Sequence, residues 1–454
     1  MKKINRRFFL GAASVLGAGM AFRPASILAG NRSFDVKPAI LGGAKAFTGQ
    51  RSKWPIIDNV DAKALLDVLY SGIWGRLDGN NATAKFEKDY AELLGVNHCL
   101  AVNSGTFALY AMLGALNVGP GDEVIIPIYT FIATYNSVIL HHALPIIVDI
   151  DPESFQIDPQ KIKSAITKET KVIMPVHIGG SPADLDAILE IGSKNKLPVI
   201  EDACQAHMAE WKGKKVGTFG IGGAYSFQSS KNLNCGEGGA ITTNDENFLK
   251  ACYGFHHQGE VKSGNPYAPE GGIRGGNLRI TEFQATLLSA QMTRLEQQAK
   301  IRSENASYLS QMLSQIPGMA PAKLYPGTTN CSYHMYMFRY DGDYFAGMSK
   351  SQFIRALSAE GVSCMRGYGE MEKTPFVTAL AKDRHYLKIY GEKTMKQWLE
   401  RIQCPQNAKV SNETALWLGQ TTLLGSKANM EQIAEAIRKI QAYAKDIKDS
   451  FTNQ

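Results

Sequence analysis

The sequence predicts an α/β fold with a mostly parallel central sheet in a large domain, followed by a smaller α+β C-terminal domain. The first observation is an alternation of short apolar runs with stretches of helical spacing. The apolar runs lie at residues 122–127, 144–149, 172–176 and 199–202, and helical stretches lie at 158–165 and 183–195. Such alternation is typical of parallel strands with helices on both faces of the sheet.

The second observation concerns the C-terminal part of the chain. From about residue 328 onward, shorter strands and helices alternate, at 333–340, 350–360 and 430–443. A long helical pattern leads up to this region and ends near residue 313. We therefore expect a large domain over residues 31–300 and a small domain over residues 301–454.

The composition excludes several classes of protein. With 454 residues, 44% of them hydrophobic and 20% charged, the chain is typical of a globular protein that buries a large core. The net charge of +7 is spread along the chain without an arginine-rich stripe, so no nucleic-acid partner is expected. The seven cysteines never form a CxxC pair, which argues against a metal site and against a disulfide framework.

Residues 1–30 have the pattern of a secretory signal. Lys2, Lys3, Arg6 and Arg7 precede an apolar, glycine-rich run at residues 8–22 that is too short for a stable membrane anchor. The paired arginines followed by Phe-Phe-Leu resemble a twin-arginine export signal, which predicts a periplasmic location. A cytoplasmic protein with a basic leader stays open as the alternative.

A phosphate-binding site is expected at Ser104-Gly105-Thr106. A short apolar strand runs into these residues, and a helical pattern opens directly after them. The amides and hydroxyls at a helix N-terminus bind phosphate, and glycine lets the backbone come close to the ligand. Ser-Gly-Thr is equally good capping chemistry, so the motif becomes informative only beside other signs of a phosphorylated cofactor.

Those other signs are Asp202 and Lys231. Asp202 ends a short apolar run and therefore falls at the carboxyl end of a predicted strand, where ligands bind in open α/β sheets. Lys231 follows another predicted strand and precedes a glycine-rich turn around Glu237. An amine that can form a Schiff base and a carboxylate that can hold a pyridinium nitrogen suit pyridoxal phosphate. The alternatives are a helix-capping aspartate and a solvated surface lysine.

Two further stretches are candidates for functional roles. Phe131 lies just after the predicted strand at 122–127, where an aromatic ring can stack on a flat cofactor, although most such aromatics belong to the core. The glycine- and proline-rich connection at residues 254–276 is long for a loop without structure, which predicts a functional role.

With these motifs placed, the chain resembles the DegT/DnrJ/EryC1/StrS aminotransferases of pyridoxal phosphate fold-type I. The resemblance extends from about residue 41 to residue 444. Its carriers are Ser-Gly-Thr at 104–106, Thr-Phe at 130–131, Glu-Asp-Ala-Cys-Gln-Ala-His at 201–207, the stretch from Tyr225 to Lys231, Gly-Glu-Gly-Gly at 236–239, and 277–285. Leu-Gly-Gly at 41–43, Trp-Pro at 54–55 and Trp-Leu-Gly-Gln at 417–420 look closest to the branch that acts on cyclitol ketones such as scyllo-inosose.

The resemblance implies a role for each matching residue. Lys231 would form the Schiff base and move the proton, while Asp202 would pair with the pyridine nitrogen. Gln205 would bind the phenolic oxygen of the ring, and Phe131 would stack on the ring. The phosphate would be held by Gly105, Thr106 and Ser226, and by Asn277 from the neighbouring subunit of a homodimer. Glu237 and His334 would lie near the substrate, with a turn-shaping role for Glu237 and a structural role for His334 as alternatives.

The implied function is transfer of an amino group from glutamate or glutamine to a ketone of a sugar or cyclitol. Sugar dehydratases of the same family are disfavoured because a histidine stands in them where Lys231 stands here. The alternative from another class is an exported, non-catalytic binding or sensory protein that keeps the fold. Export disfavours nucleotide-linked acceptors and favours a free cyclitol or sugar ketone.

Overall fold

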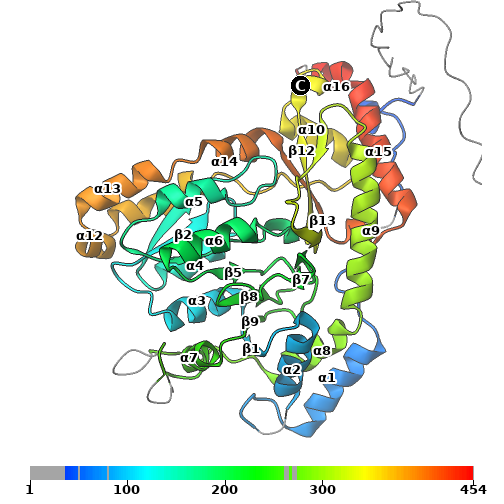
Figure 1. Ribbon diagram of the computed structural model, residues 1–454. Coiled ribbons are helices and arrows are strands. Elements are labelled where there is room, and N and C mark those ends of the chain that lie inside the picture. The colour runs from blue at the N-terminus through cyan, green and yellow to red at the C-terminus, as the bar shows by residue number, and fades with distance from the viewer. Residues whose placement is uncertain (1–35, 50–51, 79–80, 260–264, 268–273, 453–454) are drawn as a thin grey trace, which may run out of the picture. The chain divides into compact units, whose positions relative to one another are not determined.

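The computed structural model describes residues 36–49, 52–78, 81–259, 265–267 and 274–452 (Figure 1). The predicted signal at residues 1–30 lies outside the described residues. In the described part of the chain, we find no helix whose length and apolar character would allow it to cross a bilayer.

The central sheet combines two groups of strands. One group has the order β1-β9-β8-β5 and the other the order β3-β2-β4. Parallel bridges from Ile173 to Val199 and from Val176 to Asp202 join the two groups between β4 and β5. The strands are β1 (His98–Val102), β2 (Glu123–Pro127), β3 (Leu144–Val148), β4 (Thr170–Ile173), β5 (Ile200–Asp202), β8 (Gly222–Ser226) and β9 (Gly239–Thr243).

All strands of this sheet except β9 run in one direction. β9 pairs antiparallel with both β1 and β8, so β1 and β8 are parallel to each other. β5 pairs parallel with β8, and β2 pairs parallel with both β3 and β4. The expected α/β fold with a mostly parallel sheet is therefore confirmed, and its parallel strands bring their carboxyl ends to one edge.

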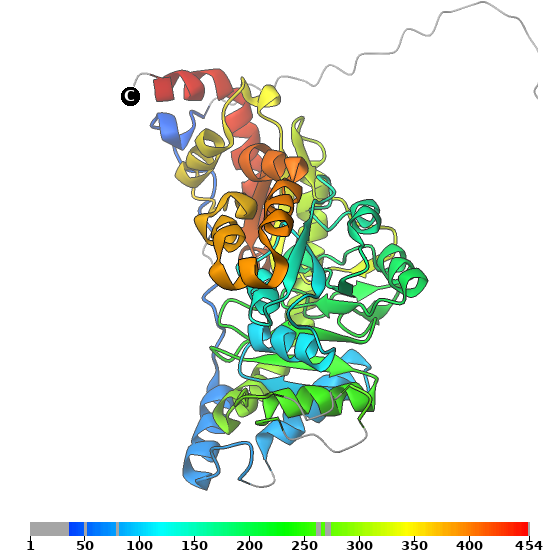
Figure 2. The same ribbon diagram turned by 90° about the vertical axis from the view of Figure 1, so that its left-hand side faces the viewer.

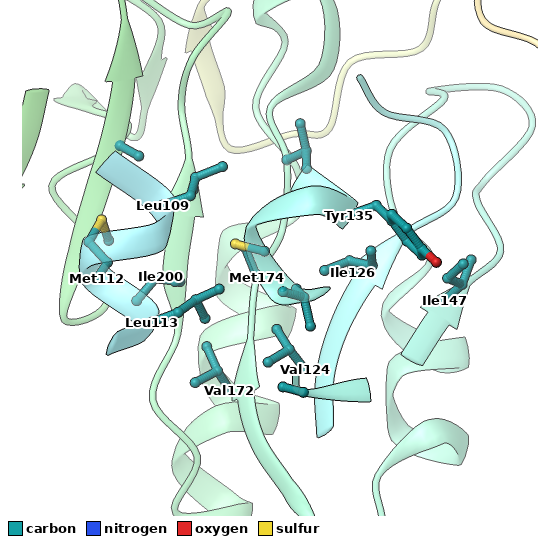
Figure 3. Packing of buried hydrophobic residues seen from close by; sticks show 14 of the residues in the cluster. Leu109, Met112, Leu113, Val124, Ile126, Tyr135, Ile147, Val172, Met174 and Ile200 are labelled. Carbon is teal, nitrogen blue, oxygen red and sulfur yellow. The ribbon is translucent and has the colours of Figure 1, made fainter. Parts of the chain in front are cut away.

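Helices cover both faces of the sheet. Successive side chains of a strand point to opposite faces, so each strand packs against both layers of helices. Val124 and Ile126 of β2 pack in a cluster with residues of helices α3, α4 and α7, whereas Ile125 between them packs with residues of α5 and α6. Figure 3 shows the first of these clusters, in which Leu109 and Leu113 of α3 face the strands. Each strand is therefore packed on both of its faces.

The helices of the large α/β part agree with the apolar periodicity of the sequence. They are α1 (Asn59–Ser71), α2 (Ala82–Leu94), α3 (Gly105–Ala115), α4 (Ile132–Ile139), α5 (Pro159–Ala165), α6 (Leu185–Asn195), α7 (Glu246–His256) and α8 (Glu282–Met292). Most of them begin at a side-chain cap, as Asp58, Asn81 and Ser104 do for α1, α2 and α3.

A second, antiparallel sheet forms the core of the C-terminal part. Its order is β10-β12-β13, and it packs in one apolar cluster with residues of α9, α10 and α15. The elements are α9 (Leu295–Leu313), β10 (Met319–Pro321), β12 (Met335–Tyr340), α10 (Lys350–Ala359), β13 (Ala415–Gly419), α15 (Lys427–Ala442) and α16 (Ala444–Thr452). The predicted domain division between residues 300 and 301 falls inside α9 and stays a prediction.

A group of short helices lies between these elements in the chain and covers the edge strand β3. The helices are α11 (Pro375–Thr378), α12 (Arg384–Tyr390), α13 (Glu392–Arg401) and α14 (Pro405–Lys409), drawn in orange at the front of Figure 2. The indole of Trp398 donates a hydrogen bond of 2.7 Å to the carbonyl of Pro145 in β3. Three short strands, β6 (Glu210–Trp211), β7 (Lys214–Lys215) and β11 (Thr328–Asn330), form a further small sheet.

Three sequence expectations need local correction. The helical pattern that ends near residue 313 is broken into α8 and α9 rather than continuous. The strand expected at 172–176 is shorter and begins earlier, as β4 (Thr170–Ile173). The connection expected at 254–276 begins inside α7, which continues to His256.

Candidate functional site

A cavity of about 570 Å³ opens at the carboxyl ends of the parallel strands. Asp202 is the last residue of β5 and Ser226 the last residue of β8. The structure brings nine of the predicted site residues together in its lining: Gly105, Thr106, Phe131, Asp202, Gln205, Ser226, Lys231, Glu237 and His334. A cavity of similar volume, about 540 Å³, lies beside β3 and α13 and contains none of them.

The N-terminus of α3 forms one wall of the cavity. Ser104 caps the helix by accepting a hydrogen bond from the amide of Phe107, and the first bond within the helix runs from Ala108 to the carbonyl of Ser104. The amides of Gly105 and Thr106 therefore have no partner inside the helix and are available to an anion. A Cβ at Gly105 would lie 2.7 Å from Cβ of Ser226 and 2.8 Å from Sγ of Cys204, so only glycine allows this close approach.

Asp202 is a buried carboxylate with capacity for one more donor. It is 5% exposed, and its Oδ2 accepts a 2.8 Å hydrogen bond from the hydroxyl of Thr134. Its Oδ1 accepts a 3.2 Å hydrogen bond from the amide of Cys204. Because a carboxylate offers about four acceptor positions, these two bonds leave room for a protonated ring nitrogen.

The orientation of the Gln205 amide is determined by its two neighbours. Its Oε1 accepts a hydrogen bond of 2.8 Å from the amide of Gly179, so its Nε2 must be the atom on the other side. That Nε2 donates to the hydroxyl of Tyr368 over 2.9 Å and keeps a second hydrogen. Gln205 thus presents an N–H donor that can reach an oxygen in the cavity.

Lys231 projects into the same cavity from the turn that follows β8. Burial lowers the pKa of its amine, while Cys204 and Asp202 raise it in part. In the described residues its Nζ makes no hydrogen bond or ion pair. A lysine without a bound carboxylate and with a lowered pKa is more easily neutral, and a neutral amine is what a nucleophile requires.

A buried histidine orients the end of β8. His207 is 1% exposed, and burial lowers its pKa to about 3, so the ring is neutral. Its Nε2 lies 2.8 Å from the carbonyl of Ser226, which can only accept, and therefore carries the hydrogen. Its Nδ1 then accepts from the hydroxyl of Tyr90 over 3.0 Å. This chain of bonds holds Ser226 beside the N-terminus of α3.

The remaining predicted residues differ in their surroundings. Phe131 directly precedes α4 and is 56% exposed, so its ring is free to contact a ligand rather than filling the core. His334 is 3% exposed with an unpartnered Nδ1 among the described atoms, and burial keeps its pKa well below the usual range. Glu237 is exposed in a turn. Asn277 is also exposed, and it does not line the cavity of its own chain.

Two residues outside the predicted set, Thr134 and Tyr368, contact it. The hydroxyl of Thr134 donates to Asp202 and lies 2.8 Å from the hydroxyl of Thr130. The two threonines are four residues apart in sequence, which is about one helical turn. Tyr368 comes from the loop before the short α11 helix, and its ring lies edge-on to Trp417 at 4.7 Å. No local signal distinguishes Tyr368, because the folding of the C-terminal part alone brings it to the cavity.

These observations fit a phosphorylated pyridine cofactor. Free amides at a helix N-terminus and the close approach at Gly105 suit its phosphate, the spare acceptor capacity of Asp202 suits its ring nitrogen, and Lys231 is an amine within the same cavity. Within the described ranges, no group of three or more metal-ligating side chains is assembled.

Comparisons with known proteins agree with this site. The model of the DegT/DnrJ/EryC1/StrS aminotransferase family matches residues 55–415. A protein of Streptoalloteichus tenebrarius named putative L-glutamine:3-amino-2,3-dideoxy-scyllo-inosose aminotransferase is 33% identical over 408 residues, which are 89% of this chain and 97% of that protein. The 3-amino-5-hydroxybenzoate synthase of Amycolatopsis mediterranei is 32% identical over 393 residues, covering 86% and 97% of the two chains.

A solved structure gives the same result for the fold. The crystal structure of 3-amino-5-hydroxybenzoic acid synthase superposes with a TM-score of 0.74 at 30% identity, over 87% of this chain and 98% of that one. The fold and the cofactor therefore follow from the family as well as from the geometry. This chain belongs to the DegT/DnrJ/EryC1/StrS aminotransferase family and is a pyridoxal phosphate-dependent aminotransferase.

Proposed function

We propose that the enzyme moves the amino group of L-glutamine to a ketone on a free carbocyclic ring of the scyllo-inosose type. The observation that carries this proposal is the match in sequence to an aminotransferase named for glutamine and a scyllo-inosose over 97% of its length. The cavity of about 570 Å³ accommodates a cofactor together with a small polyol ring. Glutamate remains the second candidate donor.

The cofactor would supply an electron-accepting ring and a carbonyl carbon that exchanges nitrogen with amines. The residues of this chain would bind and orient it: the amides of Gly105 and Thr106 at the phosphate, and Asp202 at the ring nitrogen. Lys231 would attach covalently through Nζ and, once released, accept and return a proton at the substrate carbon. The exposed ring of Phe131 would cover one face of the cofactor.

The test begins with the absorption spectrum of the purified protein, with Lys231→Ala and with Lys300→Ala, an exposed lysine that serves as control. We expect a visible band of lysine-bound pyridoxal phosphate in the native protein and in the control, and its loss in Lys231→Ala. L-glutamine labelled at its α-nitrogen and scyllo-inosose are then added, and mass spectrometry follows the label into the product.

Three outcomes separate the parts of the proposal. Label in an aminocyclitol supports it in full. A band that responds to glutamine without transfer of the label to scyllo-inosose contradicts scyllo-inosose as the acceptor and supports glutamine as the donor. A band that persists in Lys231→Ala contradicts the role of Lys231.

We also propose a homodimer in which Asn277 of each subunit completes the site of the other. Asn277 is exposed outside its own cavity, which leaves its side chain available to a neighbour. Trp74, which packs against Phe283, belongs to a set of exposed apolar side chains on and beside α1. Exposed apolar surface of this kind marks interfaces.

Export to the periplasm is proposed on the basis of Arg6 and Arg7 and the apolar run after them. The test is fractionation of cells of a bacterial host with a twin-arginine pathway. The natural chain should reach the periplasm, whereas Arg6→Lys/Arg7→Lys should stay in the cytoplasm. Equal amounts of both chains in the cytoplasm would contradict export by this route.

A further inference from the structure

The turn that leads into Lys231 is held at two successive carbonyls. The carbonyl of Ser229 accepts a 3.0 Å hydrogen bond from the indole Nε1 of Trp54. The carbonyl of Ser230 accepts a 3.0 Å hydrogen bond from Nε2 of Gln420. The turn is also held locally, by bonds from the amide of Ser229 to the carbonyl of Gly236 and from the amide of Lys231 to the carbonyl of Gln228. Trp54 and Gln420 are the donors that tie this exposed turn to distant parts of the chain.

The two donors come from distant parts of the chain and share one partner. Trp54 precedes α1, and Gln420 directly follows β13. Arg302 of α9 donates through Nη2 to Oε1 of Gln420, and its guanidinium carbon lies 5.3 Å from the centre of the Trp54 ring. Both contacts with Arg302 orient a donor group. Oε1 of Gln420 must face the arginine, so the Nε2 of the same amide is turned toward Ser230. The guanidinium over the ring of Trp54 fixes the plane of the indole.

Arg302 is an unusual residue for a structural role alone. It is completely buried, and its Nε and Nη1 have no hydrogen-bond partner among the described atoms. Burial lowers its pKa to about 9, so it remains charged at neutral pH. Burying a charge without a carboxylate partner costs stability. A group that is retained at such a cost is a candidate for function.

We propose that Arg302 is a positioning residue for Lys231. By holding Gln420 and Trp54, it fixes the carbonyls of Ser229 and Ser230 and thereby the direction in which Lys231 enters the cavity. None of Trp54, Arg302 and Gln420 lines that cavity, so the effect on Lys231 is carried by the backbone of the turn. The inference rests on the proposed role of Lys231 as the reacting amine.

Three substitutions at two positions separate positioning from folding. Trp54→Phe keeps an aromatic face for Arg302 and removes only the donor to Ser229. Arg302→Met removes the partner of both donors, and Arg302→Lys restores a cation over the ring together with a donor for Gln420. The matched control is Trp398→Phe, which loses an indole hydrogen bond of similar length to Pro145 at the distant edge strand.

The first measurement uses the cofactor-free protein. Lys231 is labelled with fluorodinitrobenzene across a pH series, and mass spectrometry of its peptide gives the pH midpoint of labelling. A loosened turn admits water to the amine, so we expect the midpoint to shift to higher pH in Trp54→Phe and Arg302→Met, to return in part in Arg302→Lys, and to stay unchanged in Trp398→Phe.

The second measurement uses the enzyme with cofactor. We expect kcat to fall about tenfold to 100-fold in Trp54→Phe, with KM little changed, because a small misplacement of a reacting group is costly. An unchanged midpoint and an unchanged kcat in Trp54→Phe would overturn the proposal, even if Arg302→Met fails to fold. A cofactor band that survives Lys231→Ala would instead contradict the proposed function, while the labelling midpoints would still report the positioning.

Discussion

At the scale of single residues, burial makes Lys231 a better nucleophile. Water stabilises an ammonium group more than the protein does, so the pKa of the lysine is lowered on folding. The neutral amine is therefore present at lower pH than in a free lysine. Cys204 and Asp202 counteract this effect in part, and the net change in the pKa is a decrease.

This shift predicts a pH dependence of stability. The folded state releases the proton of Lys231 at lower pH than the unfolded state does, so the unfolded state binds more protons between the two pKa values. The free energy of unfolding of the cofactor-free protein should rise with pH in that interval. Urea denaturation of the native protein and of Lys231→Met between pH 7 and pH 10 tests this, and the variant should lack that part of the rise. Parallel curves for the two proteins would contradict the lowered pKa.

Gly105 is the residue at which size alone determines the site. In Gly105→Ala, the new methyl group would overlap Ser226 and Cys204, so either the start of α3 or the end of β8 must move. We expect the free energy of unfolding to fall by about 1–3 kcal/mol and the affinity for pyridoxal phosphate to fall as well.

The matched control for this substitution is Gly119→Ala, where nothing lies within 4 Å of the new methyl group. Denaturation and cofactor titration of both variants provide the measurements. If Gly105→Ala bound the cofactor as tightly as Gly119→Ala, the close approach at α3 would have no part in binding.

At the scale of secondary-structure elements, Lys350 at the start of α10 anchors the segment that leads into β13. Its buried Nζ donates to the carbonyl of Arg366 over 2.8 Å and to that of Ser411 over 2.6 Å. β13 in turn ends just before Gln420, which binds the turn of Lys231. An element far from the cavity is thereby connected to it.

Lys350→Met should leave these carbonyls without the lysine donor, and the carbonyl of Ser411 is buried. We expect a loss of about 1–3 kcal/mol in the free energy of unfolding, since an unsatisfied buried acceptor costs its full desolvation energy. Lys393→Met, in which the lysine is exposed on α13, should change stability little. Thermal or urea denaturation of both variants gives the comparison, and equal stabilities would show that the Lys350 bonds contribute nothing.

At the scale of the whole molecule, the proposed dimer predicts the effect of charges on the α1 surface. Tyr70 is 82% exposed, and the neighbouring exposed apolar residues are Ile57, Val60, Leu66, Leu69, Trp74 and Leu77. Leu69→Glu/Tyr70→Glu should give a monomer in sedimentation analysis, because two carboxylates would have to be desolvated in the interface. Leu324→Glu, at an exposed leucine in the C-terminal part, is the control. A dimer that persists in the double variant would exclude this surface.

The shared site has a test of its own. Lys231→Ala and Asn277→Ala proteins are each expected to be inactive or nearly so. A mixed dimer contains one site with both residues native, if Asn277 acts across the interface. Dissociating and reassociating an equal mixture should therefore restore about a quarter of the native activity, since half of the dimers are mixed and each has one active site. Activity no higher than that of the separate variants would contradict the exchange of Asn277.

Much of the fold and the site could be predicted from local sequence. Parallel strands are buried on both faces, so they stand out as short apolar runs, and their polar ends mark the cavity. For that reason local pattern places Asp202 at the carboxyl end of a strand and Ser-Gly-Thr at the start of a helix, whereas the phosphate-binding role of Ser226 follows from the family resemblance. The Gly105→Ala and Lys231→Ala substitutions described above test the proposed roles of two of the cofactor-binding residues.

Local sequence is enough to assign the class of the protein, because a cofactor site built on strand ends and a helix N-terminus leaves its pattern within short segments. Which residues support that site, by contrast, depends on how distant elements pack against one another. Tyr368 beside Gln205, and Arg302 behind the turn of Lys231, are brought in from elements more than 70 residues away in sequence. Such contacts depend on how helices and sheets pack, and packing between distant elements leaves no periodic signal in the chain.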